Sequence, residues 1–140
     1  MKKISVLTPT YNDAKSIEET LMSLINQTYS NWESIIIDDG STDDTKFIIE
    51  NFKNKYDKDN KINYIYQENA DQLNAILNGL SKISGDYIFV LHSDDLLPNN
   101  DFFEKIVSEM EQNNCDAIIG NLEIINDKSE TVNCWKALKY

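Results

Sequence analysis

Two adjacent aspartates, Asp94 and Asp95, pose the first chemical question in this sequence. They follow the apolar segment 87–91, YIFVL, after one histidine and one serine, and this composition is typical of a strand buried on both faces. Adjacent carboxylates repel each other, and removing them from water is costly unless a cation or hydrogen bonds compensate. The pair therefore either caps the turn that follows or binds a metal ion.

Polar residues follow each of the four strand-like segments in the first hundred residues. The sequences after these segments read PTYND, DDGSTDD, ENADQ and HSDD. In open α/β sheets, ligands bind beyond the carboxyl ends of the strands, so these residues are expected to converge on one edge. The four loops contain no basic side chain. A divalent cation, Mg²⁺ or Mn²⁺, is therefore the simplest means of binding a diphosphate there.

Strand-like and helix-like patterns alternate along the chain. Strands are predicted at 4–9, 32–39, 62–67, 87–92 and 116–125, and helices at 16–27, 41–56, 71–84 and 100–113. This alternation predicts a single α/β domain over residues 1–140, with right-handed βαβ units around a mostly parallel central sheet. The dinucleotide-binding glycine fingerprint and the P-loop are both absent.

Two of the predicted helices have recognisable ends and apolar faces. The helix at 41–56 is expected to begin with Ser41 as N-cap and Asp44 as its third residue, and the helix at 71–84 to end at Gly85. Apolar residues expected to face the core are Phe47, Ile48 and Phe52 in the first, and Leu73, Ile76, Leu77 and Leu80 in the second.

The composition narrows the classes of function. The 140 residues are 41% hydrophobic, as in a globular domain, and the net charge of −11 disfavours binding to nucleic acid or to an anionic bilayer. No apolar run approaches a membrane span or a signal peptide, so a cytoplasmic protein is expected, with Cys115 and Cys134 reduced.

Each candidate residue also has a purely structural interpretation. Asp39 with Gly40 fits a turn before a helix, and Asp71 fits a helix cap. Tyr11 could be a surface aromatic, and His92 a strand-end residue with an ordinary hydrogen-bond partner. Their joint position at the strand ends favours a binding site.

Three stretches together resemble the family 2 glycosyltransferases, whose catalytic domains have the GT-A fold. These stretches are SVLTPTYN, SLINQTYSNWESIIIDDGSTDDT and NGLSKISGDYIFVLHSDDLLP, and the resemblance extends from about residue 4 to residue 121. The resemblance implies a GT-A, Rossmann-like, three-layer α/β/α fold. It also implies a metal-dependent, inverting transfer of sugar from a nucleoside-diphosphate-sugar, usually a UDP-sugar, to an acceptor hydroxyl.

The resemblance assigns roles to particular residues. Pro9 and Tyr11 would pack around uracil, Asp39 would accept a hydrogen bond from its ring N–H, and Asp71 would belong to the same nucleotide site. Asp94 would lie near the ribose and the metal, and Asp95 near the metal and the diphosphate. The expected acceptor is a saccharide or glycoconjugate in bacterial surface-polysaccharide synthesis, and the expected location is the cytoplasm, peripheral to the inner face of the membrane.

The chain departs from the family pattern at three points. His92 stands where the family often has aspartate, and Leu77 where it often has asparagine. The family's acceptor site and catalytic base lie beyond the matched stretch, so residues 1–140 are expected to be a C-terminally truncated donor-binding domain. Nothing in the sequence marks Glu123 or Asp127 as the base, so the catalytic residue stays unassigned. A truncated sheet would expose an apolar face and favour a homodimer.

Three other functions could fit an α/β domain with acidic strand ends. A donor-binding module without catalysis fits the missing base. A sugar nucleotidyltransferase would need a glycine-rich, basic first loop, which PTYND lacks. A response-regulator receiver would need its acidic pair after the first strand, where PTYN has none.

Overall fold

The computed structural model describes residues 1–126, 128 and 130–135. The chain forms two compact units, residues 1–105 and 106–140. Strands and helices alternate through the first hundred residues, as predicted: β1 (Ile4–Thr10), α1 (Ile17–Ile25), β2 (Trp32–Asp38), α2 (Thr45–Tyr56), β3 (Ile62–Tyr66), α3 (Gln72–Leu80) and β4 (Tyr87–Val90), followed by α4 (Phe102–Asn113), β5 (Leu122–Ile125) and β6 (Thr131–Trp135). In this described part of the chain, no helix is both long enough and apolar enough to cross a bilayer.

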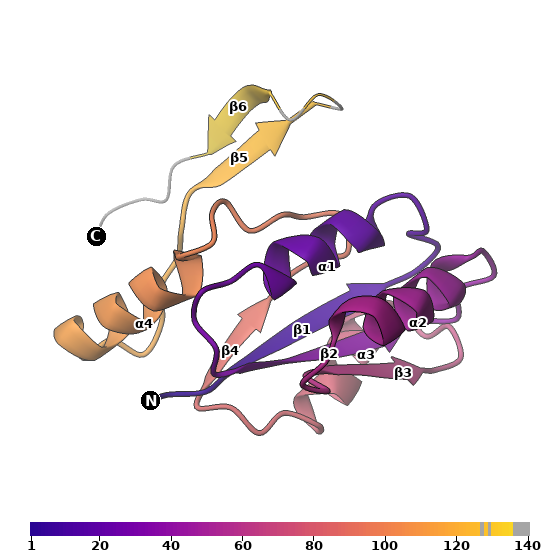
Figure 1. Cartoon of the computed structure of the whole chain (residues 1–140), viewed down its shortest axis with the longest axis horizontal. Helices are drawn as coiled ribbons and strands as arrows, with labels where there is room; N and C mark the ends of the chain where they lie inside the picture. Colours follow the sequence, from indigo (N-terminus) through magenta and orange to yellow (C-terminus); the bar gives the residue numbers. More distant parts are fainter. Residues whose placement is uncertain (127, 129, 136–140) are drawn as a thin grey trace. The chain divides into compact units, whose positions relative to one another are not determined.

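A four-stranded parallel sheet forms the centre of the first unit. Its strand order is β3-β2-β1-β4, and helices α1 and α2 cover one face while α3 covers the other (Figure 1). Right-handed connections explain this arrangement, because the chain moves from β1 to β3 in one direction and then returns across the sheet to β4. The predicted three-layer α/β/α fold is confirmed, and β1 and β4 flank the point at which the strand order reverses.

The core lies around β1 and β2, which are buried along their whole length except for one half-buried residue. Leu7, Ile35 and Ile37 form one apolar cluster with Ala75 of α3. Helix α3 approaches the sheet closely at Gly79, where a Cβ would lie 3.1 Å from Leu7 Cδ2 and 3.2 Å from Ile37 Cγ1. This close contact holds the last turn of α3 against β1 and β2.

The predicted apolar face of α3 is right for Ile76, which packs against the core cluster, and wrong for the three leucines, which are exposed. Leu73 and Leu77 are 64% and 54% exposed, and the small residues Ala75 and Gly79 face the sheet instead.

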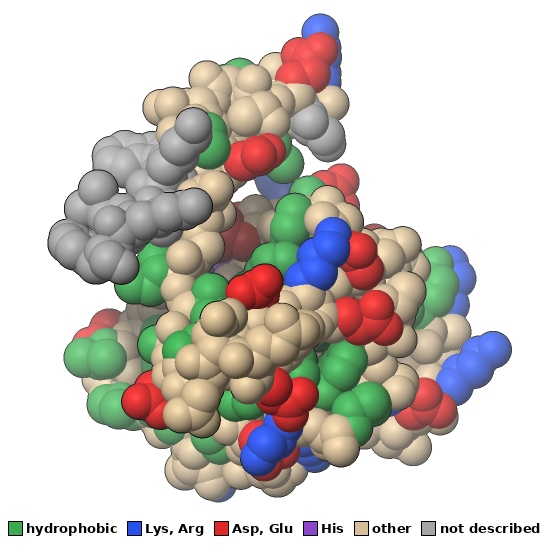
Figure 2. All heavy atoms as spheres, turned by 90° about the vertical axis from the view of Figure 1, so that its left-hand side faces the viewer, with side chains coloured by type: hydrophobic (Ala, Val, Ile, Leu, Met, Phe, Trp, Pro, Cys, Tyr) green, Lys and Arg blue, Asp and Glu red, His purple; other side chains and the backbone are tan. Residues whose placement is uncertain are grey.

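The segment 87–92 is not buried on both faces either, because β4 is an edge strand and Ile88 is 50% exposed. The homodimer expected from an exposed apolar face stays a prediction. On the face drawn in Figure 2, apolar side chains lie among many acidic ones.

The start of α2 also differs from the prediction. The helix begins at Thr45, and Asp43 Oδ1 accepts hydrogen bonds from the backbone N–H and the hydroxyl of Thr45, at 3.0 and 2.5 Å. Ser41 is therefore not the N-cap. Phe52 is buried as predicted, whereas Phe47 is exposed, because the buried face of α2 follows the i, i+4, i+7 positions Thr45, Ile49 and Phe52.

The segment 116–125 does not add a fifth strand to the parallel sheet. Only Leu122–Ile125 is a strand, and it pairs antiparallel with β6 in a separate two-stranded sheet. The run of β-branched residues predicted a strand here, but such a pattern does not identify the strand's partner.

A half-buried carboxylate, Glu33, joins three segments at the amino end of the sheet. Its oxygens accept hydrogen bonds from Ser5 Oγ at 2.6 Å, Ser84 N at 2.7 Å and Lys3 Nζ at 2.8 Å. Gly85 is needed beside this group, because a Cβ there would lie 2.6 Å from Ser5 Oγ and 2.8 Å from the Lys3 carbonyl oxygen. Helix α3 ends earlier, at Leu80, so Gly85 permits close packing rather than ending the helix.

Glu33 predicts a loss of stability in acid. Burial raises the pKa of this carboxyl, but the hydrogen bonds from Lys3, Ser5 and Ser84 outweigh burial and lower the pKa from 4.5 to about 2. A lowered pKa stabilises the fold above pH 4.5, and the stabilisation is lost as the pH falls from 4.5 towards 2. We expect Glu33→Gln to lower the free energy of unfolding by about 2 kcal/mol at pH 7. Urea titrations at pH 7, 4 and 3 measure the free energy of unfolding of the wild type and the variant. The difference between the two should become smaller as the pH falls, and a constant difference would contradict this assignment.

Candidate functional site

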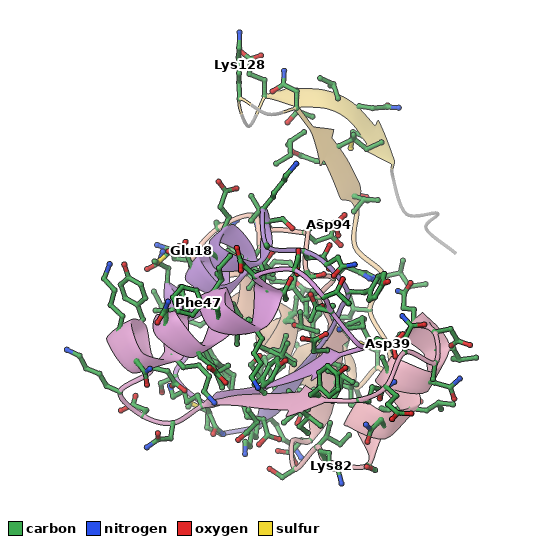
Figure 3. All side chains as sticks on the ribbon, turned by 90° about the vertical axis from the view of Figure 1, so that its right-hand side faces the viewer. Glu18, Asp39, Phe47, Lys82, Asp94 and Lys128 are labelled. Atoms are coloured by element: carbon green, nitrogen blue, oxygen red, sulfur yellow. The ribbon has the colours of Figure 1, made fainter. Side chains whose placement is uncertain are left out.

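A cavity of about 440 Å³ opens at the carboxyl ends of the strands, within residues 1–105. It lies beyond β1, β2 and β4 and beside the first turn of α3. Figure 3 looks towards this end of the sheet, and the labelled Asp39 and Asp94 both lie there. The lining residues are Pro9, Thr10, Tyr11, Asp13, Asp39, Asn69, Asp71, Gln72, Ala75, His92, Ser93 and Asp94. Five of the six predicted site residues are thus brought together, and the sixth, Asp95, is not part of the lining.

Asp39 anchors the loop between β3 and α3. Its side chain is almost fully buried, at 4% exposure. Oδ1 accepts hydrogen bonds from Gln67 Nε2 at 2.7 Å and Ala70 N at 2.9 Å, and Oδ2 accepts one from Asp71 N at 2.9 Å. A carboxylate has about four lone-pair positions, so Oδ2 retains one acceptor position for a ligand.

The neighbouring aspartate, Asp38, has a different role. It is fully buried and does not line the cavity. Its oxygens accept hydrogen bonds from Ser41 N at 2.8 Å and from the Tyr64 hydroxyl at 2.6 Å. Burial and the hydrogen bond to Asp38 raise the pKa of Tyr64 above its usual value. Asp38 therefore holds the turn after β2 in place, and only Asp39 of this pair faces the cavity.

Two residues of the first loop were not assigned roles from the sequence. Asp13 lines the cavity, and its Oδ2 accepts hydrogen bonds from Thr10 Oγ1 and Tyr11 N, both at 3.0 Å, and from the Ser93 hydroxyl. Asn12 Oδ1 accepts a hydrogen bond from Thr42 N at 2.8 Å. These contacts join the loop after β1 to the loops after β2 and β4. The only signal in the sequence was their position directly after Tyr11.

Asp71 combines a helix cap with a strained backbone. Its φ of +86° lies in a region that favours glycine, and holding such a residue there costs about 1–3 kcal/mol. Its Oδ1 accepts a hydrogen bond from Asn74 N at 3.0 Å, which caps α3 as the structural interpretation predicted. The residue also lines the cavity, so the cap and the binding interpretations of Asp71 are compatible.

Asp94 and Asp95 occupy different surroundings after β4. Asp94 is exposed and lines the cavity, whereas Asp95 is half-buried. Burial and the neighbouring charge of Asp94 raise the pKa of the Asp95 carboxyl, and His92 opposes this effect. A cation beside the two carboxylates would remove the repulsion between them.

No cluster of three or more acidic, histidine or cysteine side chains that could hold a metal ion occurs in the described part of the chain. A divalent cation at Asp94 and Asp95 would need further oxygen ligands from water or a bound phosphate. Mg²⁺ is commonly held in this way, by one or two carboxylates together with phosphate oxygens. The residues present therefore fit a cation that binds together with its ligand.

The cavity has a strongly negative lining. It contains the four carboxylates of Asp13, Asp39, Asp71 and Asp94. Every one of its lining residues is described, and none is lysine or arginine. A phosphate-bearing ligand would need a cation and uncharged N–H or O–H donors to bind there.

Comparison with known proteins identifies a family. The model of glycosyl transferase family 2 matches residues 5–135. The Escherichia coli protein WfgD, described as a UDP-Glc:alpha-D-GlcNAc-diphosphoundecaprenol beta-1,3-glucosyltransferase, is 35% identical over 127 residues. That match covers 90% of this chain and 48% of WfgD. The chain therefore spans about half the length of this relative.

Solved structures show the same fold. Residues 1–349 of S. aureus TarS, in complex with UDP, match with a TM-score of 0.73 and 28% identity, over 81% of this chain and 33% of that chain. The mannosyltransferase PcManGT from Pyrobaculum calidifontis, in complex with GDP-Man and Mn²⁺, matches with a TM-score of 0.75 and 23% identity. The second match covers 91% of this chain and 36% of that chain, and it supports the fold alone.

Proposed function

Because this chain belongs to glycosyl transferase family 2, we propose that it binds the donor of a glycosyltransferase that moves sugar from a UDP-sugar to an acceptor hydroxyl. The observation that carries this proposal is the single cavity that contains Tyr11, Asp39 and Asp94 at three different strand ends. A cavity of about 440 Å³ falls within the usual range for small-molecule sites. The names of WfgD and of the TarS–UDP complex support a uridine nucleotide as the donor.

The base of the nucleotide would lie at the Asp39 end of the cavity. Asp39 retains an acceptor position, and uracil offers one ring N–H that would donate to it. Pro9 and the half-exposed Tyr11 provide apolar surface for the ring at the end of β1. Asp71, at the start of α3, closes this part of the nucleotide site.

The diphosphate would lie at the Asp94 end. We propose that Asp94 and Asp95 hold Mn²⁺ or Mg²⁺ there, and that water and phosphate oxygens complete the coordination. A divalent cation in this position would neutralise charge on the departing diphosphate. The acidic lining supports this proposal, because it offers no lysine or arginine for the same purpose.

The acceptor and its general base are not assigned to residues of this chain. Glu123 lies in β5, where its carboxylate accepts a hydrogen bond from Thr131 Oγ1 at 3.1 Å, and Asp127 lies outside the described residues. Loss of general-base catalysis typically lowers a rate by ~10²–10⁴. We therefore expect residues 1–140 to bind the donor and to transfer sugar slowly. We propose that the transfer inverts the anomeric carbon and belongs to surface-polysaccharide or glycoconjugate synthesis.

A binding and transfer experiment tests this function. Calorimetry with UDP-, GDP- and ADP-sugars in Mn²⁺ should show binding of UDP-sugars in preference to the others. Transfer would then be measured with the same donors and a panel of saccharide acceptors. Absence of any nucleotide-sugar binding would refute the proposal. Fast, acceptor-dependent transfer would instead mean that the general base lies within residues 1–140.

A further inference from the structure

Among the residues that line the cavity, His92 has the one ring nitrogen that can donate, and none is lysine or arginine. The lining side chains that can donate an N–H are Asn69, Gln72 and His92. Asn69 Nδ2 donates to the Asp39 carbonyl oxygen at 2.9 Å. Gln72 Nε2 lies 3.0 Å from His92 Nδ1. Both amides therefore have partners within the protein, whereas His92 Nε2 makes no hydrogen bond with the part of the chain that the structure describes.

The contact with Gln72 assigns the proton on the imidazole ring. With the Gln72 amide as donor, His92 Nδ1 accepts, and a neutral imidazole then carries its proton on Nε2. Gln72 is the first residue of α3, and His92 follows β4, so the two side chains meet across the cavity. The pair therefore fixes both the orientation of the ring and its donor atom.

The contact with Gln72 places this donor between the two ends of the proposed nucleotide site, because Gln72 follows Asp71, whose backbone N–H donates to Asp39 Oδ2. Asp39 follows β2 and Asp94 follows β4, with β1 between these strands. His92 lies two residues before Asp94, on the β4 side of the cavity. A ligand with its base at Asp39 and its diphosphate at Asp94 would present its ribose and α-phosphate oxygens to His92.

We propose that His92, oriented by Gln72, binds the nucleotide by donating its Nε2–H to an oxygen of the ribose or of the α-phosphate. This inference rests on the proposed function. Ribose hydroxyls and phosphate oxygens both accept hydrogen bonds, and four carboxylates in the cavity cannot supply one. His92 thus donates a hydrogen bond to the sugar–phosphate part of the ligand, whereas the carboxylates of the cavity repel its phosphates.

Two substitutions at His92 separate this role from a structural one. Gln places its amide nitrogen near the position of imidazole Nε2, so His92→Gln retains the donor, whereas His92→Phe keeps a ring and removes the donor. In calorimetry with UDP and Mn²⁺, we expect His92→Phe to weaken binding by about 5–100-fold, the range for losing one hydrogen bond to a neutral or charged oxygen. His92→Gln should stay within about threefold of the wild type.

Nucleotide fragments identify the oxygen that accepts the hydrogen bond. If the ribose accepts it, His92→Phe weakens uridine and UDP equally, whereas if the phosphate accepts it, UMP and UDP are weakened and uridine is not. Either result supports the proposal, provided that melting temperatures show both variants folded. Unchanged UDP binding by His92→Phe, or equal losses in the Phe and Gln variants, would overturn it. If the wild type bound no UDP at all, the proposed function would fail and this inference with it.

Discussion

Removal of divalent cations is expected to lower the affinity of the chain for UDP by about 100-fold or more. The cavity contains four carboxylates and no lysine or arginine among its lining residues, all of which are described. Two like charges 4 Å apart repel by about 4 kcal/mol at the effective dielectric constant of a protein surface, and 100-fold in affinity corresponds to only about 2.7 kcal/mol. Calorimetry with UDP in Mn²⁺, in Mg²⁺ and in chelator measures the difference.

A matched variant tests whether Asp94 and Asp95 are the source of this dependence. In the double variant Asp94→Asn, Asp95→Asn, the two side chains keep their shape and lose their charge. We expect weaker UDP binding than the wild type in Mn²⁺ and a much smaller difference between Mn²⁺ and chelator. Equal affinity of the wild-type chain with and without metal would remove the basis for the metal site.

Substitution of Asp39 by alanine is expected to affect both folding and binding. The variant leaves three donors without their acceptor, those of Gln67 Nε2, Ala70 N and Asp71 N. We expect the free energy of unfolding to fall by about 2–4 kcal/mol, since each buried donor left unsatisfied costs about 1–3 kcal/mol and water reaches part of this loop. In the folded variant, the free energy of UDP binding should become less favourable by about 1–3 kcal/mol, because the hydrogen bond from the uracil N–H is lost.

The experiment on Asp39 must separate these two effects. Urea unfolding measures stability, and calorimetry well below the melting temperature measures binding of uridine and UDP by the folded fraction. Gln67→Ala is the control, because it removes one donor to Asp39 and keeps the carboxylate. If folded Asp39→Ala binds uridine as the wild type does, Asp39 positions the loop and does not contact the base.

The positions of the strand ends could be predicted from the sequence because they depend on local patterns. Alternating apolar runs and helical periodicity indicated the order of elements through β4, and short loops placed Tyr11, Asp39, Asp71 and Asp94 after strands or before a helix. Parallel strands direct their carboxyl ends to one edge, so the convergence of these residues followed from fold class alone. The cavity lining confirms that they come together.

The roles within each acidic pair required the tertiary structure. Asp38 and Asp39 are adjacent and chemically identical. The Tyr64 hydroxyl, on the neighbouring strand, donates a hydrogen bond to Asp38, whereas the backbone of the loop before α3 donates to Asp39. Asp13 likewise gains its partner Ser93 from a loop 80 residues away. Such pairings depend on contacts between distant segments, which no local pattern in the sequence contains.

Burial was the other property that the sequence left open. The amino-acid sequence by itself determined the alternating α/β order and the set of polar residues at the strand ends, because both depend on neighbours along the chain. Only the tertiary structure decided that β4 lies at an edge, that Ala75 and Gly79 rather than Leu73 and Leu77 face the sheet, and that β5 pairs with β6. These outcomes depend on which elements lie next to one another, and an apolar residue is buried only where another element covers it.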